Sequence, residues 1–350
     1  MPIAIERAID AVLAPFLPGI DLRPSVVASD VRAVSDLYNG LPASTVPPDR
    51  RLAAQLLFFL PADLGKVPFC LSELAAAKAL PARRVLRLLD LGAGPGTASL
   101  GAAIALAGMV DEIQITAVDR DARALEVGRA LHVELSDDDG SSPGAGIRRA
   151  VRTVATDLAR GRIPDGEFDL VVIQGLLSEL PGGAREPLVR AAIGALAPDG
   201  AAIVIEPALR TTARALHALR DAIRAGNVAH VFAPCVRQGP CPALDREDDW
   251  CHEDREWDPS PRVVEIGRLA GLRRGGLKFA YVTFVRGGAS VADSVPGKGT
   301  ISRVVSDLMR SKGKSEAFFC NDDGRTRVTV LNRNRSEAFD RLRRGDLVRS

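Results

Sequence analysis

The sequence is poor in aromatic residues, which make up only 4% of its 350 positions. This low content argues against a broad aromatic platform for stacking nucleic-acid bases. The opening stretch, MPIAIERAIDAVLAPFLPG, lacks the basic segment and continuous apolar core of a secretory signal. No window reaches the run of about 18 apolar residues that a membrane-spanning helix needs. We therefore expect a cytoplasmic protein without membrane contact.

Charge is nearly balanced over the whole chain, with 46 Lys and Arg against 44 Asp and Glu. Residues 301–350 depart from this balance, because they hold 12 basic and 7 acidic residues. A basic terminal segment on a near-neutral body suggests contact with phosphate, and RNA rather than DNA is the expected partner. A solvated surface is the alternative interpretation.

Strand-like apolar runs alternate with helix-like stretches along the middle of the chain. This alternation predicts an α/β fold with a Rossmann-like, doubly wound parallel sheet. The strand candidates are VLRLLDLGAG, EIQITAVDR, IRRAVRTVATDL, FDLVVIQGLL, AAIVIEP and LKFAYVTFV. The predicted organisation is a helical region at 1–82, a core at 83–286 with a cysteine-rich insertion at 233–261, a linker at 287–300 and a basic, β-rich unit at 301–350.

A glycine-rich turn follows the first predicted strand, in the sequence LLDLGAGPGTAS. Its glycines, Gly92, Gly94 and Gly96, allow a tight turn and a close approach of a ligand to the backbone. Asp119 ends the second strand, where a carboxylate accepts hydrogen bonds from ribose hydroxyls. These two features fit both a dinucleotide and S-adenosylmethionine.

Three further details favour S-adenosylmethionine. Asp90 leads the turn, Pro95 removes a backbone donor that a pyrophosphate would use, and Asp157 with Leu158 follows the third strand, where adenine can bind. Together D-L-G-A-G-P-G-T, Asp119 and D-L at 157–158 resemble the cofactor motifs of class I methyltransferases. The predicted cofactor-binding residues are Asp90, Gly92, Ala93, Gly94, Gly96, Asp119, Asp157, Leu158 and Gln174.

The segment after the fourth strand, IQGLLSELP, contains neither N-P-P-Y nor a nucleophilic cysteine. Glu179 is polar and close by, but we expect it to face solvent or to cap the following turn. Glu206, at the end of the fifth strand, has a pocket role and a structural role as equal interpretations. We therefore assign no catalytic residue, and a core that binds its cofactor without turnover is an open alternative.

Three cysteines within 17 residues, in the pattern C-x5-C-x9-C, suggest a metal site in a reduced chain. The spacing does not choose the metal, although zinc loops usually show C-x2-4-C knuckles and iron–sulfur clusters tolerate irregular spacing. The three are Cys235, Cys241 and Cys251, and the candidates for a fourth ligand are His252, Cys70 and Cys320.

A wider pattern resembles the small-ribosomal-subunit methyltransferase-like family, which has bacterial members and a mitochondrial member that assists mitoribosome assembly. The pattern consists of IEP at 205–207, APCVRQGPCP, DDWCH, KFAYVTFVR and KGKSEAFFCNDDGR, and the resemblance covers about residues 25–350. It implies that a [4Fe–4S] cluster is ligated by Cys235, Cys241, Cys251 and Cys320.

The resemblance also implies a methyltransferase-like protein that acts on the small ribosomal subunit or its rRNA. A non-catalytic rRNA-binding assembly factor and a zinc-stapled small-molecule methyltransferase are the alternatives. One departure from the family is the stretch between Cys241 and Cys251, which is longer and more acidic than expected.

Overall fold

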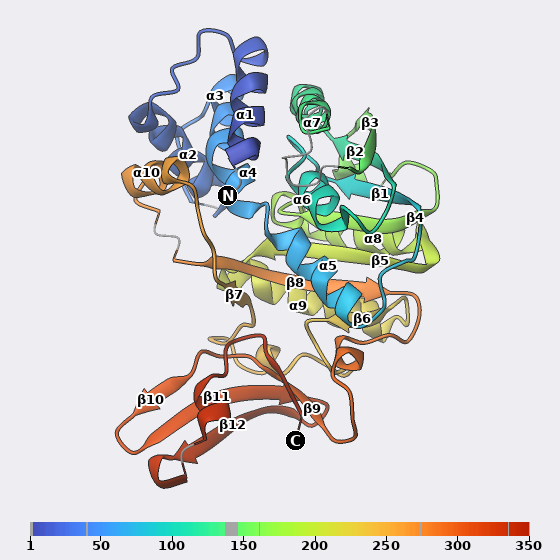
Figure 1. Ribbon diagram of the computed structural model, residues 1–350, viewed down its shortest axis with the longest axis vertical. Helices are drawn as coiled ribbons and strands as arrows, with labels where there is room; N and C mark the ends of the chain where they lie inside the picture. The colour runs from blue at the N-terminus through green and yellow to red at the C-terminus, as the bar shows by residue number, and fades with distance from the viewer. Residues whose placement is uncertain are drawn as a thin grey trace.

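The apolar runs of the middle segment form an eight-stranded mixed sheet at the centre of the chain (Figure 1). The computed structural model describes residues 3–39, 41–136, 146–160, 162–272, 275–334 and 336–349. The strands are β1 (Val85–Leu91), β2 (Glu112–Asp119), β3 (Arg148–Ala155), β4 (Phe168–Gln174), β5 (Leu196–Pro207), β6 (His230–Ala233), β7 (Glu253–Arg255) and β8 (Leu277–Val285).

The strands lie in the order β3-β2-β1-β4-β5-β8-β6, with β7 paired to β8. The pairs from β3 to β5 are parallel, whereas β8 is antiparallel to β5, β6 and β7. This order, with one reversed strand beside β5, is the topology of class I methyltransferases. The predicted α/β fold is confirmed, but the sheet is mixed rather than wholly parallel.

Helices cover both faces of the sheet, so its central strands are apolar on both sides. In β1 the neighbours Leu88 and Leu89 point to opposite faces and belong to two separate core clusters. The covering helices are α6 (Thr97–Leu106), α7 (Ala122–Glu134), α8 (Gly182–Gly194) and α9 (Arg210–Ala225). The short helices η2 (Leu158–Arg160), η3 (Leu177–Glu179) and η4 (Pro242–Leu244) lie in loops.

A helical layer precedes the sheet in the chain and packs beside its glycine-turn edge (Figure 1). It contains α1 (Ile3–Phe16), α2 (Pro24–Tyr38), α3 (Pro48–Ala54), the π-helical turn η1 (Gln55–Phe59) and α4 (Leu60–Asp63). The next helix, α5 (Lys66–Ala76), covers the sheet itself, where it packs against α6, β5 and β8. The later helix α10 (Pro261–Leu269) joins this layer, where it packs against α2 and η1.

One continuous helix in this layer, Pro48–Ala76, is long and apolar enough to cross a membrane by length and composition. Asp63 and Lys66 interrupt its apolar run, so the sequence holds no continuous apolar stretch of membrane-spanning length here. In addition, 67% of its most apolar window is buried inside the protein, which is the environment of a core helix.

The C-terminal unit is a second, five-stranded antiparallel sheet (Figure 1). It has a small core of its own, centred on Val304, Ala317 and Phe339. Its elements are β9 (Ile301–Val304), β10 (Met309–Ser311), β11 (Lys314–Asn321), β12 (Gly324–Leu331), η6 (Asn332–Asn334), α11 (Glu337–Asp340) and β13 (Leu347–Arg349). The predicted linker at 287–300 is packed rather than free, since its short helix η5 (Val291–Ser294) buries Val291 in the main core.

A buried arginine fastens the C-terminal unit to the main sheet. Arg303 of β9 is only 2% exposed. Its guanidinium donates to Glu73 of α5 at 2.7 Å, to Glu253 of β7 at 2.9 Å and to the Tyr281 hydroxyl of β8 at 3.1 Å. Cys320 of β11 lies directly opposite Arg303 in the β11–β9 pair. The same anchor therefore places Cys320 against the main domain.

We expect Arg303→Met to loosen the C-terminal unit, because Glu73 would lose its cation and the buried Glu253 would keep only its ion pair with Arg255. Breaking a buried ion pair in this way costs about 3–5 kcal/mol. Denaturant unfolding and limited proteolysis of residues 301–350 measure the effect, with Arg333→Met, at an exposed position of the same unit, as control. Equal protease resistance in both variants would show that the anchor contributes little.

Candidate functional site

A pocket of about 920 Å³ opens at the carboxyl ends of β1, β2, β3, β4 and β5. It lies where the strand order reverses between β1 and β4, the usual ligand position in such sheets. The structure brings most of the predicted cofactor residues together on its wall. These are Gly92, Ala93, Gly94, Asp119, Asp157, Leu158 and Gln174.

The glycine turn leaves no space for a side chain at Gly92 but is open to the pocket at Gly94. Gly92, Gly94 and Gly96 all have positive φ, at 77°, 50° and 87°. A Cβ on Gly92 would lie 2.9 Å from the Leu176 side chain, whereas one on Gly94 would meet nothing within 4 Å. The backbone at Gly94 is therefore accessible from the pocket, as close ligand approach requires.

Two of the predicted cofactor residues, Asp90 and Gly96, lie behind the turn and are not part of the pocket wall described by the structure. Asp90 is 1% exposed, and one of its oxygens accepts a hydrogen bond from the Ser99 backbone amide at 3.1 Å. Burial raises the pKa of Asp90 to about 7. Asp90 thus fixes the start of α6 beneath the turn, while Gly96 allows α7 to pack closely at Gly128.

The ends of β2 and β3 supply two carboxylates to the wall. One Asp119 oxygen accepts from the Gly94 amide and the other from the Asp121 amide, both at 2.9 Å. Asp119 therefore holds the glycine turn and borders the pocket at the same time. Asp157 accepts from the Ala159 amide at 3.0 Å, which shapes the turn after β3.

Glu206 at the end of β5 supports the loop after β4. It is 2% exposed, and its two oxygens accept from the backbone amides of Leu177 at 2.8 Å and Ser178 at 3.2 Å. Burial raises the pKa of Glu206. These bonds favour the structural interpretation, because the carboxylate is buried and positions η3.

Gln174 and Glu179 face the pocket from the β4 end. The Gln174 amide nitrogen reaches the Asp63 carbonyl at 3.4 Å, and its buried oxygen has no hydrogen-bond partner among the described residues. Glu179 forms an ion pair with Arg120 at 3.3 Å, and burial raises the pKa of Glu179. Glu179 therefore lines the pocket and, as expected, is also exposed to solvent.

The N-terminal helical layer adds a further wall to the pocket. Tyr38 of α2, Arg51 of α3, and Gln55 and Phe59 of η1 all line the pocket. No local motif marks them, and only their position on helices near breaks in the chain could have suggested it.

Four cysteines meet between the main domain and the C-terminal unit. Cys235, Cys241 and Cys251 come from the loops between β6 and β7, and Cys320 comes from β11. Burial, followed by the nearby Cys235 thiol, raises the pKa of Cys241 to about 12 and that of Cys320 to about 11. Burial also raises the pKa of Cys251, with the other three thiols as the next causes. The four thiols therefore lie within electrostatic reach of one another.

The other two candidate ligands stand apart from this group. Cys70 is fully buried in the main core on α5, and His252 stacks on Trp250 with ring centroids 6.1 Å apart. Within the described part of the chain, no three His, Cys, Asp or Glu side chains form a group able to hold a metal ion. The structure thus gathers the four cysteines without a formed metal geometry.

One face of α9 holds the cysteine loop in place. Arg220 is 1% exposed and donates to the carbonyls of Arg237, at 2.6 Å, and Gly239. Asp221 accepts from the Cys241 amide at 2.9 Å. His217 lies 3.1 Å from the Cys251 carbonyl. This polar helix face satisfies the backbone of an irregular loop, which explains how a turn-rich segment is ordered.

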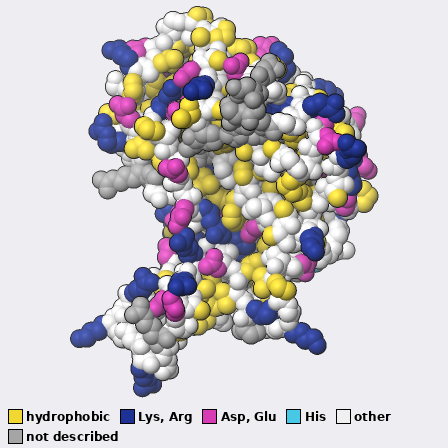
Figure 2. Space-filling view, in the orientation of Figure 1, with side chains coloured by type: hydrophobic (Ala, Val, Ile, Leu, Met, Phe, Trp, Pro, Cys, Tyr) yellow, Lys and Arg dark blue, Asp and Glu magenta, His cyan; other side chains and the backbone are white. Residues whose placement is uncertain are grey.

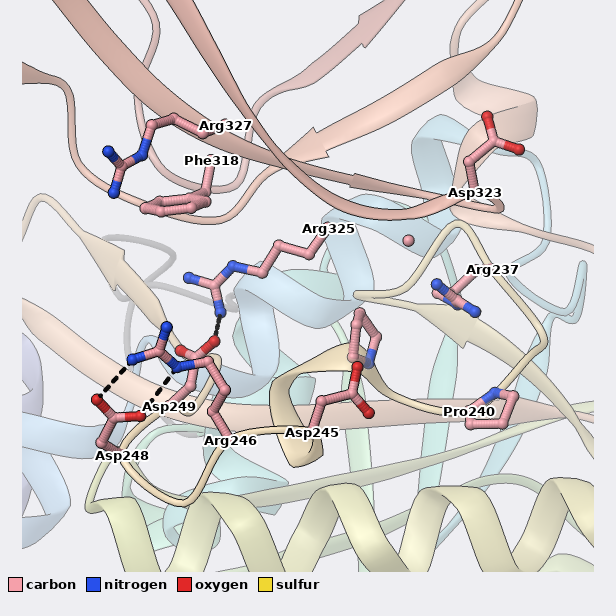
Figure 3. Close-up of a pocket in the computed structure, with 12 residues that line it drawn as sticks. Arg237, Pro240, Asp245, Arg246, Asp248, Asp249, Phe318, Asp323, Arg325 and Arg327 are labelled. Carbon is pink, nitrogen blue, oxygen red and sulfur yellow. Dashed lines mark hydrogen bonds and ion pairs between the residues drawn. The ribbon is translucent and has the colours of Figure 1, made fainter.

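A groove of about 750 Å³ separates the cysteine loop from the outer face of β11 and β12 (Figure 3). On one wall the Arg325 and Arg327 guanidinium carbons lie 4.8 and 5.0 Å from the Phe318 ring centroid. On the other wall Arg246 pairs with Asp248 at 3.1 Å. An ion pair between Arg325 and Asp249 crosses the groove (Figure 3).

One family model matches the chain. The family model described as mitochondrial small ribosomal subunit Rsm22 matches residues 53–347. No curated protein matches the chain.

Solved structures with some likeness include three methyltransferases. A TehB-like S-adenosylmethionine-dependent methyltransferase from Corynebacterium glutamicum is 18% identical, with 61% of this chain and 87% of that one covered and a TM-score of 0.34. Magnesium protoporphyrin IX methyltransferase from Synechocystis, with bound SAH, is 12% identical, with 76% and 100% covered and a TM-score of 0.39. Precorrin-6y C5,15-methyltransferase from Geobacter metallireducens is 16% identical, with 61% and 87% covered and a TM-score of 0.35. Likenesses this distant carry no argument about function.

Asp90→Asn should flatten the pH dependence of stability. The pKa of Asp90 is about 7 in the folded chain and 3.8 as its ordinary value, so between these values the folded state holds a proton that the unfolded state has lost. The protonated Asp90 contributes its full stabilisation below pH 3.8. This contribution falls by about 1.4 kcal/mol per pH unit as the pH rises from 3.8 to about 7. Urea unfolding from pH 4 to pH 8 tests this, with the exposed Asp165→Asn as control. The same slope in Asp90→Asn and wild type would contradict it.

Proposed function

The chain belongs to the Rsm22 family, and from this membership we propose that it is an S-adenosylmethionine-dependent methyltransferase that acts on the small ribosomal subunit or its RNA. The observation that carries the proposal is the convergence of the glycine turn, Asp119 and Asp157 on one pocket at the sheet edge. These groups come from three different strand ends, and only the fold brings them together.

The pocket residues suit the parts of S-adenosylmethionine in turn. The open backbone at Gly94 admits the cofactor closely, and Asp119 accepts hydrogen bonds from the ribose hydroxyls. Asp157 and the Leu158 amide are placed for adenine, at the end of β3. When bound, the cofactor supplies an electrophilic methyl group. The protein orients the reactants and excludes water, and orientation is a large part of catalysis for such a transfer.

Asp119→Ala should weaken S-adenosylmethionine binding by about 1.5–3 kcal/mol, because the ribose hydroxyls lose a charged acceptor. Isothermal titration calorimetry measures the loss. Asp165→Ala removes the same charge at an exposed position outside the pocket and should bind like wild type. Undiminished affinity in Asp119→Ala would remove this residue from the site.

We further propose that Cys235, Cys241, Cys251 and Cys320 hold a [4Fe–4S] cluster, with zinc as the alternative. The chemistry of the donor set supports the proposal, since thiolates are the usual ligands of such clusters and the four thiols lie within electrostatic reach of one another. Three ligands belong to the main domain and the fourth to the C-terminal unit. A bound cluster would therefore crosslink the two units and couple its binding energy to their docking.

Cys320→Ser should remove the broad visible absorption of protein purified without oxygen and lower its iron content. Cys70→Ser is the matched control, since Cys70 is buried away from the four thiols and should leave both signals intact. His252→Ala tests a Cys3His zinc site, in which Cys320 would be dispensable. A colourless protein with one zinc and no iron would exclude the cluster while leaving the four-cysteine site.

The groove beside the cysteine loop supports contact with RNA. Phe318 with its two neighbouring guanidinium groups can stack on an unpaired base, and Arg246 and Arg327 are exposed enough to meet phosphates. Figure 2 shows further Lys and Arg side chains projecting from the C-terminal unit. RNA binding would use these charges through the release of counterions.

Arg246→Ala combined with Arg327→Ala should weaken binding to small ribosomal subunits about tenfold and lower the salt slope by about one per arginine. Filter binding between 50 and 200 mM salt measures both. The double variant Arg84→Ala with Arg129→Ala removes equal charge from the main domain and should bind normally. Parallel losses in both variants would mean that net charge, rather than the groove, drives binding.

A non-catalytic assembly factor is the second candidate function. The specific observation in its favour is that Glu206, a buried acid at the pocket edge, is already bonded to two backbone amides. Transfer of tritiated methyl from S-adenosylmethionine to small-subunit RNA separates the two functions. Cofactor binding without transfer to immature or mature subunits would favour the assembly factor.

A further inference from the structure

An acidic segment, DREDD at 245–249, lies between Cys241 and Cys251 and contributes to one wall of the groove that faces β11 and β12. We propose that this segment is an autoinhibitory contact, in which its carboxylates occupy the arginines of the groove and RNA must displace them to bind. This inference rests on the proposed RNA contact of the groove and adds its regulation.

Consecutive acids of the segment hold an arginine on each wall of the groove. Asp249 forms an ion pair with Arg325 across the groove (Figure 3). Asp248 accepts two hydrogen bonds from Arg246, at 3.2 and 3.1 Å. A guanidinium fork binds carboxylates and phosphates in the same planar geometry. An RNA phosphate that approaches either arginine therefore competes with a carboxylate that is already in place.

The ion pair of Asp249 lies at the aromatic ring of the groove. The guanidinium carbon of Arg325 is 4.8 Å from the Phe318 ring centroid, so Asp249 holds the cation beside the proposed stacking ring. The side chains of Arg325 and Asp249 are 16% and 25% exposed. Salt therefore screens this pair less than a fully exposed one, while solvent still reaches it. A ligand in the groove can thus displace the carboxylate.

Other contacts hold the two walls of the groove in place. One nitrogen of Arg214 donates to the carbonyls of Ala243 and Asp249, at 2.9 and 2.7 Å, which fixes the backbone of the acidic segment. The buried Arg303 anchors the opposite wall to the main domain. Because both walls have these anchors, the Asp249 carboxylate can leave Arg325 without unfolding the groove.

The rival interpretation is that Asp249 only orients Arg325 over Phe318. Loss of the carboxylate would then release the guanidinium from the ring and weaken RNA binding. The contact between Arg325 and Phe318 joins neighbouring strands of one sheet and holds the guanidinium by itself, which favours autoinhibition. Autoinhibition predicts tighter binding when the carboxylate is lost, so the sign of the change in affinity separates the two interpretations.

The test uses the full-length protein and a fluorescent single-stranded RNA of mixed sequence, with anisotropy as the measurement. Asp249→Asn keeps the shape of the side chain and removes its charge. We expect this variant to bind the RNA about threefold to fivefold more tightly than wild type at low salt. The gain should shrink as salt increases, because salt also weakens the internal ion pair of the wild type.

Two further variants separate the ion pair from general repulsion. Glu247→Gln removes the same charge from an exposed position of the same segment and should bind close to wild type. Asp249→Asn combined with Arg325→Gln completes a double-mutant cycle. In the Arg325→Gln background, Asp249→Asn should give no gain, since no cation remains to be released.

Four outcomes would overturn the autoinhibition alone, given RNA binding by wild type. They are unchanged affinity in Asp249→Asn, weaker binding in that variant, an equal gain in Glu247→Gln, and a gain that persists without Arg325. If neither wild type nor Asp249→Asn bound the RNA, the proposed RNA contact would be overturned and this inference with it.

Discussion

The buried guanidinium of Arg303 is the contact on which the arrangement of the two units depends. It bonds Glu73, Glu253 and Tyr281 from three elements of the main domain. Both sides of this contact carry a cysteine, because Cys320 lies opposite Arg303 and Cys251 precedes Glu253 by two residues. Removing a charged pair from water is costly, so the contact is maintained only when every partner is in place. The ion pairs therefore fix the approach of the thiols and of the groove walls together.

Helix α9 orders the backbone of the cysteine loop. Loops rich in Pro and Gly leave many carbonyls unpaired, and buried carbonyls need donors. Arg220 supplies them for the first half of the loop, and Arg214 does the same at Ala243 and Asp249, at 2.9 and 2.7 Å. Both arginines lie on one face of the helix, so a regular element acts as the template for an irregular one.

Local patterns in the sequence were enough to predict the central sheet and to name residues that the structure gathers on one pocket wall. Buried strands are continuous apolar runs, and the turn at Gly92 and Gly94 needs a backbone that only glycine adopts easily. The reversed direction of β8 and the wall at Tyr38 were not predicted, because both depend on segments distant in sequence. Arg303 gave no signal either, since a lone arginine in a basic segment is typical of an exposed surface.

One short segment, Glu206 to Ala208, links the pocket at the sheet edge to the cysteine loop. Glu206 holds the loop after β4 through two backbone amides, and that loop forms one side of the pocket. Two residues later the Ala208 carbonyl, also on the pocket wall, accepts from the Trp250 indole at 3.2 Å, next to Cys251. Ordering of the cysteine loop thus fixes Trp250, and Trp250 in turn fixes the end of β5. Glu206 at that end then holds the loop that carries Ser178 and Glu179. Each of these contacts joins a side chain, of Glu206 or of Trp250, to the backbone, so the support depends on these two side chains. The four-cysteine group and the pocket at the sheet edge are in this sense built as one structure.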